Sequence, residues 1–528
     1  MLGFEGEDSR EKVIVLLTMC FALAMAMLDN TVVNVALPTI NRELGASVSQ
    51  LQWIVDGYVL AFASLLLTGG ILGDRYGRKR MFLTGLSIFT LASLACGLSA
   101  SSTQLIVFRA IQGIGAALLM PGTLSILTVT FPPHERARAI GLWAGVSGIA
   151  LALGPTLGGY MVEHLGWASV FFLNVPIGII AIIVAVRTVR ESRSEHARQL
   201  DIPGLVLGTW ALFSITYALI EANGLGWSDP KIISALIGGA VLVAVFLYWE
   251  SRSPKAMMPL SFFRIPAFSA GSLVAFSVSL GMFATFFFLS LYMQNPYLRN
   301  YTAFQAGLRF LPMTLMIVVT APNAGHFAAK HGSRAPMTYG LILAGGGLLA
   351  LSFLTPTTPY WQMGIVFAIM GHGMGATMAP MTAAVMNAVG AQRAGLGSAM
   401  TNTSREVGGV FGIALLGTIL FTGLKSALAP ALVGLGLTAQ QQSVITISAS
   451  HGTLDPSKLG LTPDQQAAVG KAFGDAFMSG FQMALIVAGC VLLLAAVVAN
   501  RFIPGRESEA IHGAPAAEPI PAGLEAAG

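Results

Sequence analysis

Long apolar runs, broken by short polar segments, dominate the pattern of hydrophobic and polar positions along this chain. They recur from residue 13 to residue 500, and turn signals such as Pro132-Pro133, Asp229-Pro230 and Pro356 separate them. About 20 apolar residues cross a bilayer as a helix, because a helix satisfies its own backbone hydrogen bonds there. The pattern therefore predicts an all-α polytopic membrane protein. The fourteen predicted spans are residues 13–37, 51–72, 80–99, 104–128, 138–160, 168–186, 203–221, 231–249, 267–293, 303–323, 336–355, 359–382, 398–421 and 477–500.

Composition excludes several other classes of protein. The chain of 528 residues is 55% hydrophobic and only 10% charged, with a mean hydropathy of +0.73, whereas a soluble chain carries roughly 25% charged residues. Its three cysteines all lie in apolar runs and cannot form a disulfide framework. Soluble-enzyme, secreted and disordered classes are therefore excluded. The formal net charge of +5 reflects a bias among the loops and gives no reason to expect a nucleic-acid partner.

The distribution of Lys and Arg predicts the orientation. With the N-terminus inside, the segments facing the cytoplasm hold 20 of the 29 Lys and Arg residues, and those on the other face hold six. Positively charged loops stay on the cytoplasmic side of a membrane. We therefore expect a multi-pass protein of the cell (inner) membrane with both termini in the cytoplasm. The acidic N-terminal segment is unlike a signal peptide, so we expect the first span to remain as an anchor.

An internal repeat predicts the architecture. Gly70 and Gly77 in one loop, and Gly325 and Gly332 in another, share a spacing of seven residues and the same flanking basic positions. The span-4 sequence Gly113-Ile-Gly115 likewise has a counterpart 260 residues later. Parallel repeats around a central site are typical of one large class of transporters.

We therefore expect four regions. They are an N-terminal six-span half (1–186), cytoplasmic linkers with inserted spans 7 and 8 (187–266), a C-terminal six-span half (267–503) with a long outer loop (422–476), and a disordered cytoplasmic tail (504–528). Three roles stay open for the outer loop: gating, covering the mouth, or docking a periplasmic or other outer-face partner.

Four motifs lie in or beside the spans. They are Leu28-Asp29-x-Thr31-Val32-Val33-Asn34-Val35-Ala36-Leu37-Pro38, Gly70-x-Leu72-x-Asp74-Arg75-x-Gly77-Arg78-Lys79, Arg109-x-x-Gln112-Gly113-x-Gly115 and Gly154-Pro155-x-x-Gly158-Gly159. In this order they resemble the motifs of the major facilitator superfamily, and the first resembles that of its 14-span drug:proton antiporters of the EmrB/QacA type. The resemblance implies a major facilitator fold of two parallel six-helix halves with two inserted helices.

The resemblance also implies a conformational switch in two motifs. The switch residues would be Gly70, Asp74, Arg75, Gly77, Arg78, Gly154, Pro155, Gly158 and Gly159. Physically, glycines permit a tight loop, small residues let helices approach closely, and a proline permits a bend. A plain basic turn and a generic packing face are the structural alternatives. The chain departs from the family pattern at Ala150, where a glycine is usual, and at Ala329, where Asp74 has its counterpart.

Six charged residues lie well inside the predicted spans, away from their ends: the acids Asp29, Asp56 and Glu406, and the arginines Arg109, Arg309 and Arg405. An ionised residue at the bilayer centre costs about 2.5–3.5 kcal/mol on translocon scales. Such groups therefore pair, titrate or line water. Asp29 and Arg109 have similar estimated depths, so we expect them to meet. We predict that Asp29, Asp56, Glu406 and Arg109 carry proton coupling, with static structural pairing as the alternative.

Further side chains at similar depths are candidates for a substrate cavity. They are Trp53, Tyr58, Trp143, Phe283, Tyr292, Phe310, His372 and Arg405. Aromatic faces attract lipophilic cations, and His titrates near neutral pH. Ordinary packing is the alternative for each.

The leading functional hypothesis is a proton-coupled antiporter that exports lipophilic, cationic small molecules by alternating access, that is, multidrug efflux. The alternative keeps the fold and exports lipids or natural products, and uptake by symport is a further rival. A membrane enzyme or sensor is disfavoured, because we find no HExxH, CxxC or GxxxxGK[ST] motif. We expect no cofactor and no metal site. The expected partners are a small-molecule substrate, protons and the lipid bilayer.

The orientation is testable with single cysteines. A membrane-impermeant thiol reagent added from outside should modify a cysteine placed at Ser450 and miss one placed at Ser192, because the two positions fall on opposite faces. The reverse pattern would contradict the orientation, and labelling at both positions would contradict the number of spans.

Overall fold

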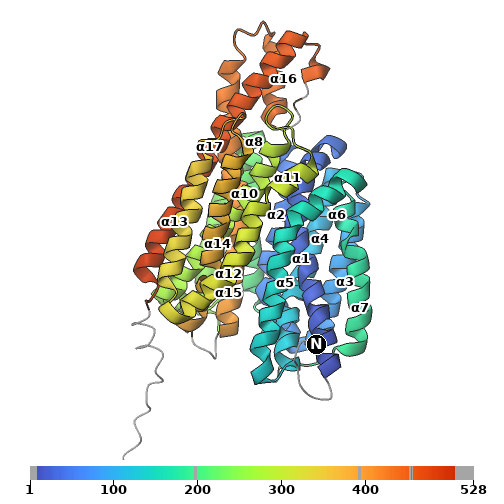
Figure 1. Cartoon of the computed structure of the whole chain (residues 1–528), viewed down its shortest axis with the longest axis vertical. Helices are drawn as coiled ribbons and strands as arrows, with labels where there is room; N and C mark the ends of the chain where they lie inside the picture. Colours follow the sequence, from blue (N-terminus) through green and yellow to red (C-terminus); the bar gives the residue numbers. More distant parts are fainter. Residues whose placement is uncertain (1–8, 195–198, 390–393, 451–453, 455, 506–528) are drawn as a thin grey trace, which may run out of the picture.

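The computed structural model describes residues 9–194, 199–389, 394–450, 454 and 456–505, and long helices running side by side make up most of it (Figure 1). Helices of the N-terminal region are α1 (Ser9–Leu44), α2 (Val48–Tyr76), α3 (Arg78–Gly97), α4 (Ser102–Thr130), α5 (Pro133–Leu165), α6 (Ser169–Phe172) and α7 (Asn174–Thr188). The next two are α8 (Ile202–Leu225) and α9 (Pro230–Arg252). A short 3-10 helix, η1 (Leu260–Arg264), precedes α10 (Pro266–Gln294).

The C-terminal region continues with α11 (Ala303–Arg309), α12 (Leu311–His331), α13 (Arg334–Leu351), α14 (Tyr360–Val389), α15 (Ala394–Ala431), α16 (Ala439–Ser450), the 3-10 helix η3 (Pro456–Leu459) and α17 (Pro463–Phe502). Each predicted span coincides with one of these helices or with a broken pair. Twelve described helices are long and apolar enough to cross a membrane, and the bent helix α5 makes a thirteenth. The chain is thus an all-helical membrane protein, and the count of fourteen spans stays a prediction.

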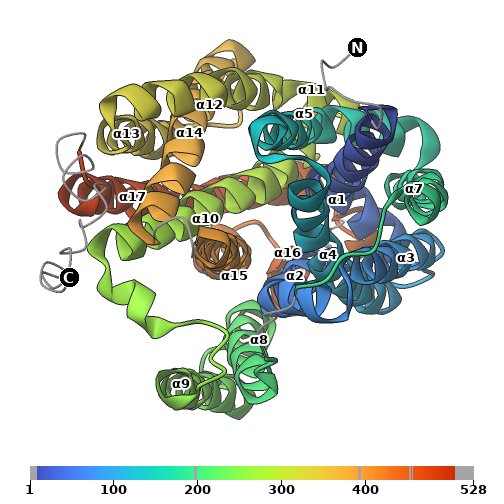
Figure 2. The same ribbon diagram turned by 90° about the horizontal axis from the view of Figure 1, so that it is seen from below.

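Corresponding helices of the two regions make corresponding contacts. Within the first region α1 packs on α5, α2 on α4, and α4 and α7 on α3. In the second, α10 packs on α15, α12 on α14, and α14 and α17 on α13. Figure 2 shows these two groups on opposite sides of the molecule. The contact pattern is what two parallel repeats of six helices would produce.

Proline accounts for two interruptions of the helices. Helix α5 bends by 40° between Ala150 and Ala152. Pro155 lies one turn further on, and its ring displaces the carbonyl of the residue four positions earlier. Helix α12 starts anew after α11, with Pro312 in its first turn, where a proline needs no hydrogen-bond donor.

The inserted helices α8 and α9 differ in what they touch. Helix α8 contacts both α2 and α15, whereas α9 packs mainly on α8 at the periphery (Figure 2). Trp53 Nε1 on α2 donates to Glu221 Oε1 on α8 at 2.8 Å. Thr418 Oγ1 on α15 donates to the Leu219 carbonyl at 2.6 Å. Helix α8 therefore joins the two regions.

The predicted outer loop 422–476 is largely helical. Helix α15 continues through it to Ala431, α16 lies within it, and α17 begins at Pro463. A capping box between Thr462 and Gln465 starts α17 well before the predicted span. These segments project beyond the other helices at the end of the bundle opposite the start of α1 (Figure 1). Apart from residues 504 and 505, the predicted disordered tail lies outside the described residues.

Polar contacts between the two regions gather towards the end that carries α16. Ser290 Oγ donates to the Asn34 carbonyl at 2.8 Å and Gln294 Nε2 to the Val35 carbonyl at 3.1 Å. Gln52 Nε2 donates to the Ile413 carbonyl at 3.0 Å. Towards the other end, the contact is apolar: Leu67 of α2 joins a cluster containing Phe262, Phe268, Val385 and Met400.

Candidate functional site

A buried polar network surrounds Asp29 in the N-terminal region. Arg109 Nη1 lies 2.5 Å from Asp29 Oδ2. The other carboxylate oxygen, Oδ1, accepts from Gln112 Nε2 at 2.8 Å and from Asn174 Nδ2 at 3.0 Å. Gln112 and Asn174 also donate to Ser93 Oγ, at 2.8 and 3.3 Å. The predicted meeting of Asp29 and Arg109 is thus observed, within a network that the sequence did not show.

Arg109 is held on several sides. Its Nε donates to the Ile54 carbonyl at 3.0 Å, and its guanidinium carbon lies 4.2 Å from the centre of the Tyr58 ring. Only 1% of the residue is exposed. Removing one partner of such a buried pair costs about 3–5 kcal/mol, because the other charge is left uncompensated. This network is therefore a strong structural constraint.

Asp56, on α2, has quite different surroundings. It is fully buried, and within the described residues neither carboxylate oxygen has a hydrogen-bond partner. Gln52 and Trp53, one turn earlier, contact α15 and α8. Residues four apart share a helix face, so Asp56 lies where α2 meets these two helices. On α8, Thr216 is also buried, and its hydroxyl has no hydrogen-bond partner in the part of the chain that the structure describes.

Glu406, on α15, is the second of the predicted coupling acids that has a carboxylate oxygen without a hydrogen-bond donor among the described residues. It is 6% exposed, and its Oε2 has no hydrogen-bond partner among the described residues. Arg405 points its Nη1 towards Asn402 Oδ1 at 3.4 Å rather than pairing with Glu406 in the described part of the chain. The Tyr58 phenol lies within electrostatic range of Asp29, Arg109 and Glu406. Tyr58 therefore adjoins the N-terminal network through Arg109 and also senses the charge of Glu406.

The loop that joins α2 to α3 contains the predicted switch residues. Arg78 donates from Nε and Nη2 to Asp74 Oδ1, at 3.0 and 2.8 Å. Gly77 has a φ of +117°, and a Cβ there would lie 2.7 Å from the Glu191 carboxyl carbon. Only glycine suits this position, because the backbone conformation and the carboxylate both exclude a side chain.

Glu191 was missed by the sequence analysis, which considered only the basic residues of the linker. Its Oε1 and Oε2 accept the backbone N–H groups of Lys79 and Arg80, at 3.1 and 3.2 Å, and so cap α3. Ser192 and Ser194 pair through their backbones with Arg78 and Asp74. The contact joins residues 112 positions apart, and no local pattern marks a partner at that distance.

The span-5 motif fits between two helices. A Cβ on Gly158 would lie 2.9 Å from a Val32 methyl on α1, and one on Gly159 would lie 2.8 Å from the Phe304 Cα on α11. Thr156 Oγ1 donates to the Gly307 carbonyl at 3.2 Å. Gly154 faces Thr31, and Gly307 faces the Pro155 backbone. The small residues therefore permit close contact between the two regions.

The remaining candidates fall into two groups. Trp53, Trp143 and His372 are half-buried and hydrogen-bonded, Trp143 to Thr123 and His372 to Thr320. Phe283, Tyr292 and Phe310 are buried within the C-terminal region, with Tyr292 stacked on Phe481 and Phe310 on Phe367. In this conformation these rings serve packing, and their contact with cargo stays a prediction.

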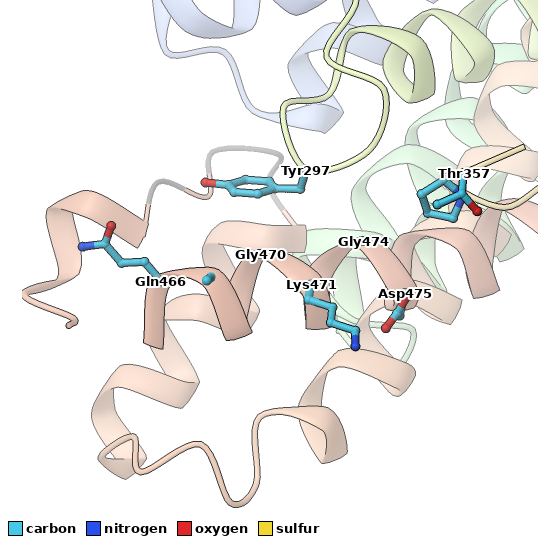
Figure 3. Close-up of a pocket in the computed structure, with 9 residues that line it drawn as sticks. Tyr297, Thr357, Gln466, Gly470, Lys471, Gly474 and Asp475 are labelled. Atoms are coloured by element: carbon cyan, nitrogen blue, oxygen red, sulfur yellow. The ribbon is translucent and has the colours of Figure 1, made fainter. Parts of the chain in front are cut away.

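A cavity of about 580 Å³ lies near the end of the bundle that carries α16 rather than beside the buried acids. Tyr297, Thr357 and the first turns of α17, from Gln466 to Asp475, line it (Figure 3). None of the charged candidates contributes to its wall. Within the described residues, no group of three His, Cys, Asp or Glu side chains is placed to hold a metal ion.

Comparison with known proteins fits this architecture. Residues 19–413 match the family model described as Major Facilitator Superfamily. The chain is 33% identical over 512 residues to the Tetracenomycin C resistance and export protein of Streptomyces glaucescens, covering 96% of this chain and 94% of that one. It is 40% identical to the Methylenomycin A resistance protein of Streptomyces coelicolor, covering 75% and 83%. It is 34% identical to Multidrug resistance protein Stp of Mycobacterium tuberculosis, covering 80% and 78%.

A solved structure shares the fold. It is a bacterial homologue of the human lysosomal transporter Spinster, in an inward-facing and unoccupied conformation. The TM-score is 0.63 at 17% identity, covering 93% of this chain and 98% of that one. The sequence match, the relatives and the helical architecture agree: the chain belongs to the Major Facilitator Superfamily. It is thus a member of a family of membrane transporters and not an enzyme.

The span-5 packing predicts a contrast between two glycines of α5. Gly159→Ala should destabilise the protein by about 1–3 kcal/mol, because the added methyl overlaps α11. Gly148→Ala is the matched control, since a Cβ there meets nothing within 4 Å. The midpoint of thermal unfolding in detergent measures both. Equal midpoints for the two variants would contradict the close contact.

The loop geometry predicts a role for Glu191. Glu191→Gln should weaken the cap of α3 by about 0.5–2 kcal/mol and slow transport several-fold with little change in substrate affinity. Glu11→Gln is the control, because Glu11 makes only an exposed ion pair with Arg190 at 3.1 Å. Initial rates at varied substrate concentration measure the effect. Wild-type rates in Glu191→Gln would show that the cap is dispensable.

Proposed function

We propose that this chain is a proton-coupled antiporter that exports lipophilic small molecules across the cell (inner) membrane by alternating access. The single observation that carries the proposal is that, within the described part of this transporter fold, the buried acids Asp56 and Glu406 have carboxylate oxygens without a hydrogen-bond partner. An ionised carboxylate buried without donors costs several kcal/mol. Each acid can avoid this cost by taking up a proton, which is the elementary act of coupling.

The four predicted coupling residues then have different roles. Asp56 and Glu406 lie at the contact of helices from both halves and carry the exchangeable proton. Asp29 has hydrogen-bond donors on both oxygens, so it holds Arg109 in place and is second choice as a proton carrier. Tyr58 contacts Arg109 and lies within electrostatic range of Glu406, so it would couple the Asp29 network to Glu406.

Alternating access is supported by the unequal contacts between the halves. Hydrogen bonds join α1 to α10 and α2 to α15 towards the outer end, whereas Leu67 makes an apolar contact towards the cytoplasmic end. Breaking the hydrogen bonds at the outer end would open the outer face. Two features would stabilise the inward-open and outward-open conformations. They are the signature loop with Asp74 and the glycine-lined contact between α5 and α11.

The names of the relatives support a proposal for the cargo. Two of them are named for resistance to single antibiotics and one for multidrug resistance. We infer that the cargo is an antibiotic-like natural product or a drug of similar lipophilicity. A cationic cargo was expected from the sequence. The membrane helices carry three arginines and three acids, so they have no excess negative charge that would select a cation. Export of lipids remains the second candidate.

We further infer the topology of the 14-span drug:proton antiporters. The contacts of α10 to α17 repeat those of α1 to α7, and α8 with α9 lies between the two sets. Helix α13, of 18 residues, would be the fourteenth span. Both termini would then be cytoplasmic, with α16 on the outer face.

Purified protein in liposomes with an imposed pH gradient tests the proposal. Ethidium and tetracenomycin C are suitable probes, with proton flux recorded in parallel. Wild type should move at least one probe with opposite proton flow. Asp56→Asn and Glu406→Gln should lose gradient-driven transport at least tenfold yet keep exchange of labelled for unlabelled probe, because exchange needs no net proton movement.

The controls separate coupling from folding. Glu221→Gln, on α8, should behave as wild type because that carboxylate already bonds Trp53. Asp29→Asn should instead reduce the yield of folded protein, since it leaves Arg109 without its anion. Normal coupling in the double variant Asp56→Asn/Glu406→Gln would refute the assignment, and probe movement without proton counterflow would refute antiport.

A further inference from the structure

Two buried carboxylates meet at the cytoplasmic ends of α8 and α9, outside the site described above. Asp201 precedes α8 and Glu250 lies in the last turn of α9, and they are 5% and 4% exposed. Both lie just beyond the predicted spans 203–221 and 231–249. The mechanism proposed above uses neither of them.

Each carboxylate has one satisfied and one unsatisfied oxygen. Asp201 Oδ1 accepts from the backbone N–H of Gly204 at 3.0 Å and from Trp249 Nε1 at 2.8 Å. Glu250 Oε2 accepts from the backbone N–H of Met258 at 2.9 Å. The other oxygens, Asp201 Oδ2 and Glu250 Oε1, have no donor among the described residues.

The two unsatisfied oxygens face the same point. A Cβ built on Gly204 would lie 2.6 Å from Asp201 Oδ2 and 2.6 Å from Glu250 Oε1. Glycine at this position therefore leaves open the space that both unsatisfied oxygens border. Two carboxylates can share a hydrogen bond only if one of them carries a proton.

We propose that Asp201 and Glu250 form a proton-binding site in which a single proton is shared between Asp201 Oδ2 and Glu250 Oε1. The proton supplies the missing donor to both oxygens and leaves the pair with one negative charge, whereas two buried anions side by side would repel. It ties α8 to α9 and, through Met258, to the segment leading to α10. Because α8 contacts both α2 and α15, the site links the cytoplasmic proton concentration to the helix that joins the halves.

Other charged groups of the same segments point elsewhere. Arg252, Lys255 and Arg264 are exposed on α9, on the turn after it and on η1. Glu221, at the far end of α8, bonds Trp53. The preceding residues Glu195, His196 and Arg198 lie outside the described residues.

Infrared difference spectroscopy of the full-length protein in lipid nanodiscs tests the site. Glu250→Gln and Asp201→Asn keep the shape and can still form one hydrogen bond across the pair. Each should remove one protonated-carboxyl band at pH 7, and the double variant should remove no more than either single variant. Glu221→Gln, in the same inserted pair, should remove none. Unchanged bands in both single variants would show that the pair is fully ionised, and additive losses would show two separate protons; either result overturns the proposal.

A second measurement uses stability. The folded state with the shared proton holds more protons than the unfolded chain, so wild-type stability should fall as pH rises, by up to tenfold in the ratio of folded to unfolded protein per pH unit. The double variant Asp201→Asn/Glu250→Gln should lose this part of the pH dependence. An unchanged pH dependence in the double variant would contradict the site. Neither measurement requires cargo, so its outcome is independent of the proposed export function.

Discussion

The ion pair between Asp29 and Arg109 is the interaction on which the N-terminal half depends. Its hydrogen-bonded partners come from five helices: Asp29 from α1, Ile54 from α2, Ser93 from α3, Arg109 and Gln112 from α4, and Asn174 from α7. Apolar side chains can pack in several alternative arrangements. A buried charge is restricted to positions where it has a partner, because an unpaired charge in a medium of low dielectric constant raises the free energy of the folded state. The network therefore holds these five helices in one arrangement.

The other two acids of the membrane helices, Asp56 and Glu406, differ from Asp29 in their hydrogen bonding. Asp56 and Glu406 are buried like Asp29, yet among the described residues both Asp56 oxygens and Glu406 Oε2 have no hydrogen-bond donor. In the proposed antiport, a change in their charge would act on the contact between the two regions. The satisfied charges would keep each region rigid, and the unsatisfied ones would respond to protons. The glycines of α5 and the signature loop would then allow the two regions to move without losing close packing.

The sequence predicted the parts of this arrangement that depend on local pattern. Apolar runs gave the positions of the membrane helices, and the rarity of charge in those runs identified Asp29, Asp56, Arg109 and Glu406. Similar estimated depths in the membrane were enough to pair Asp29 with Arg109, because few basic side chains lie well inside the predicted spans. The sequence could not show the amides of Gln112 and Asn174 around Asp29, because amides occur throughout membrane helices and their partners lie far along the chain.

Other features were missed for related reasons. Glu191 and Glu250 sit at helix ends, where acids are common, and only the folded backbone shows what each one contacts. Several aromatic candidates, such as Tyr292 and Phe310, have the right depth but face the interior of the C-terminal half, because a depth estimate carries no information on direction. The helical extension around α16 replaced an expected loop, since its polar composition concealed the capping box that starts α17.

Proton release on cargo binding tests the central claim most directly. Purified protein in weakly buffered detergent, with a pH-indicator dye, should release protons when a transported probe is added, because cargo and proton compete for the same acids. The release should disappear in the double variant Asp56→Asn/Glu406→Gln while the probe still binds. Full release from that variant would contradict the account and move the exchangeable proton to another group.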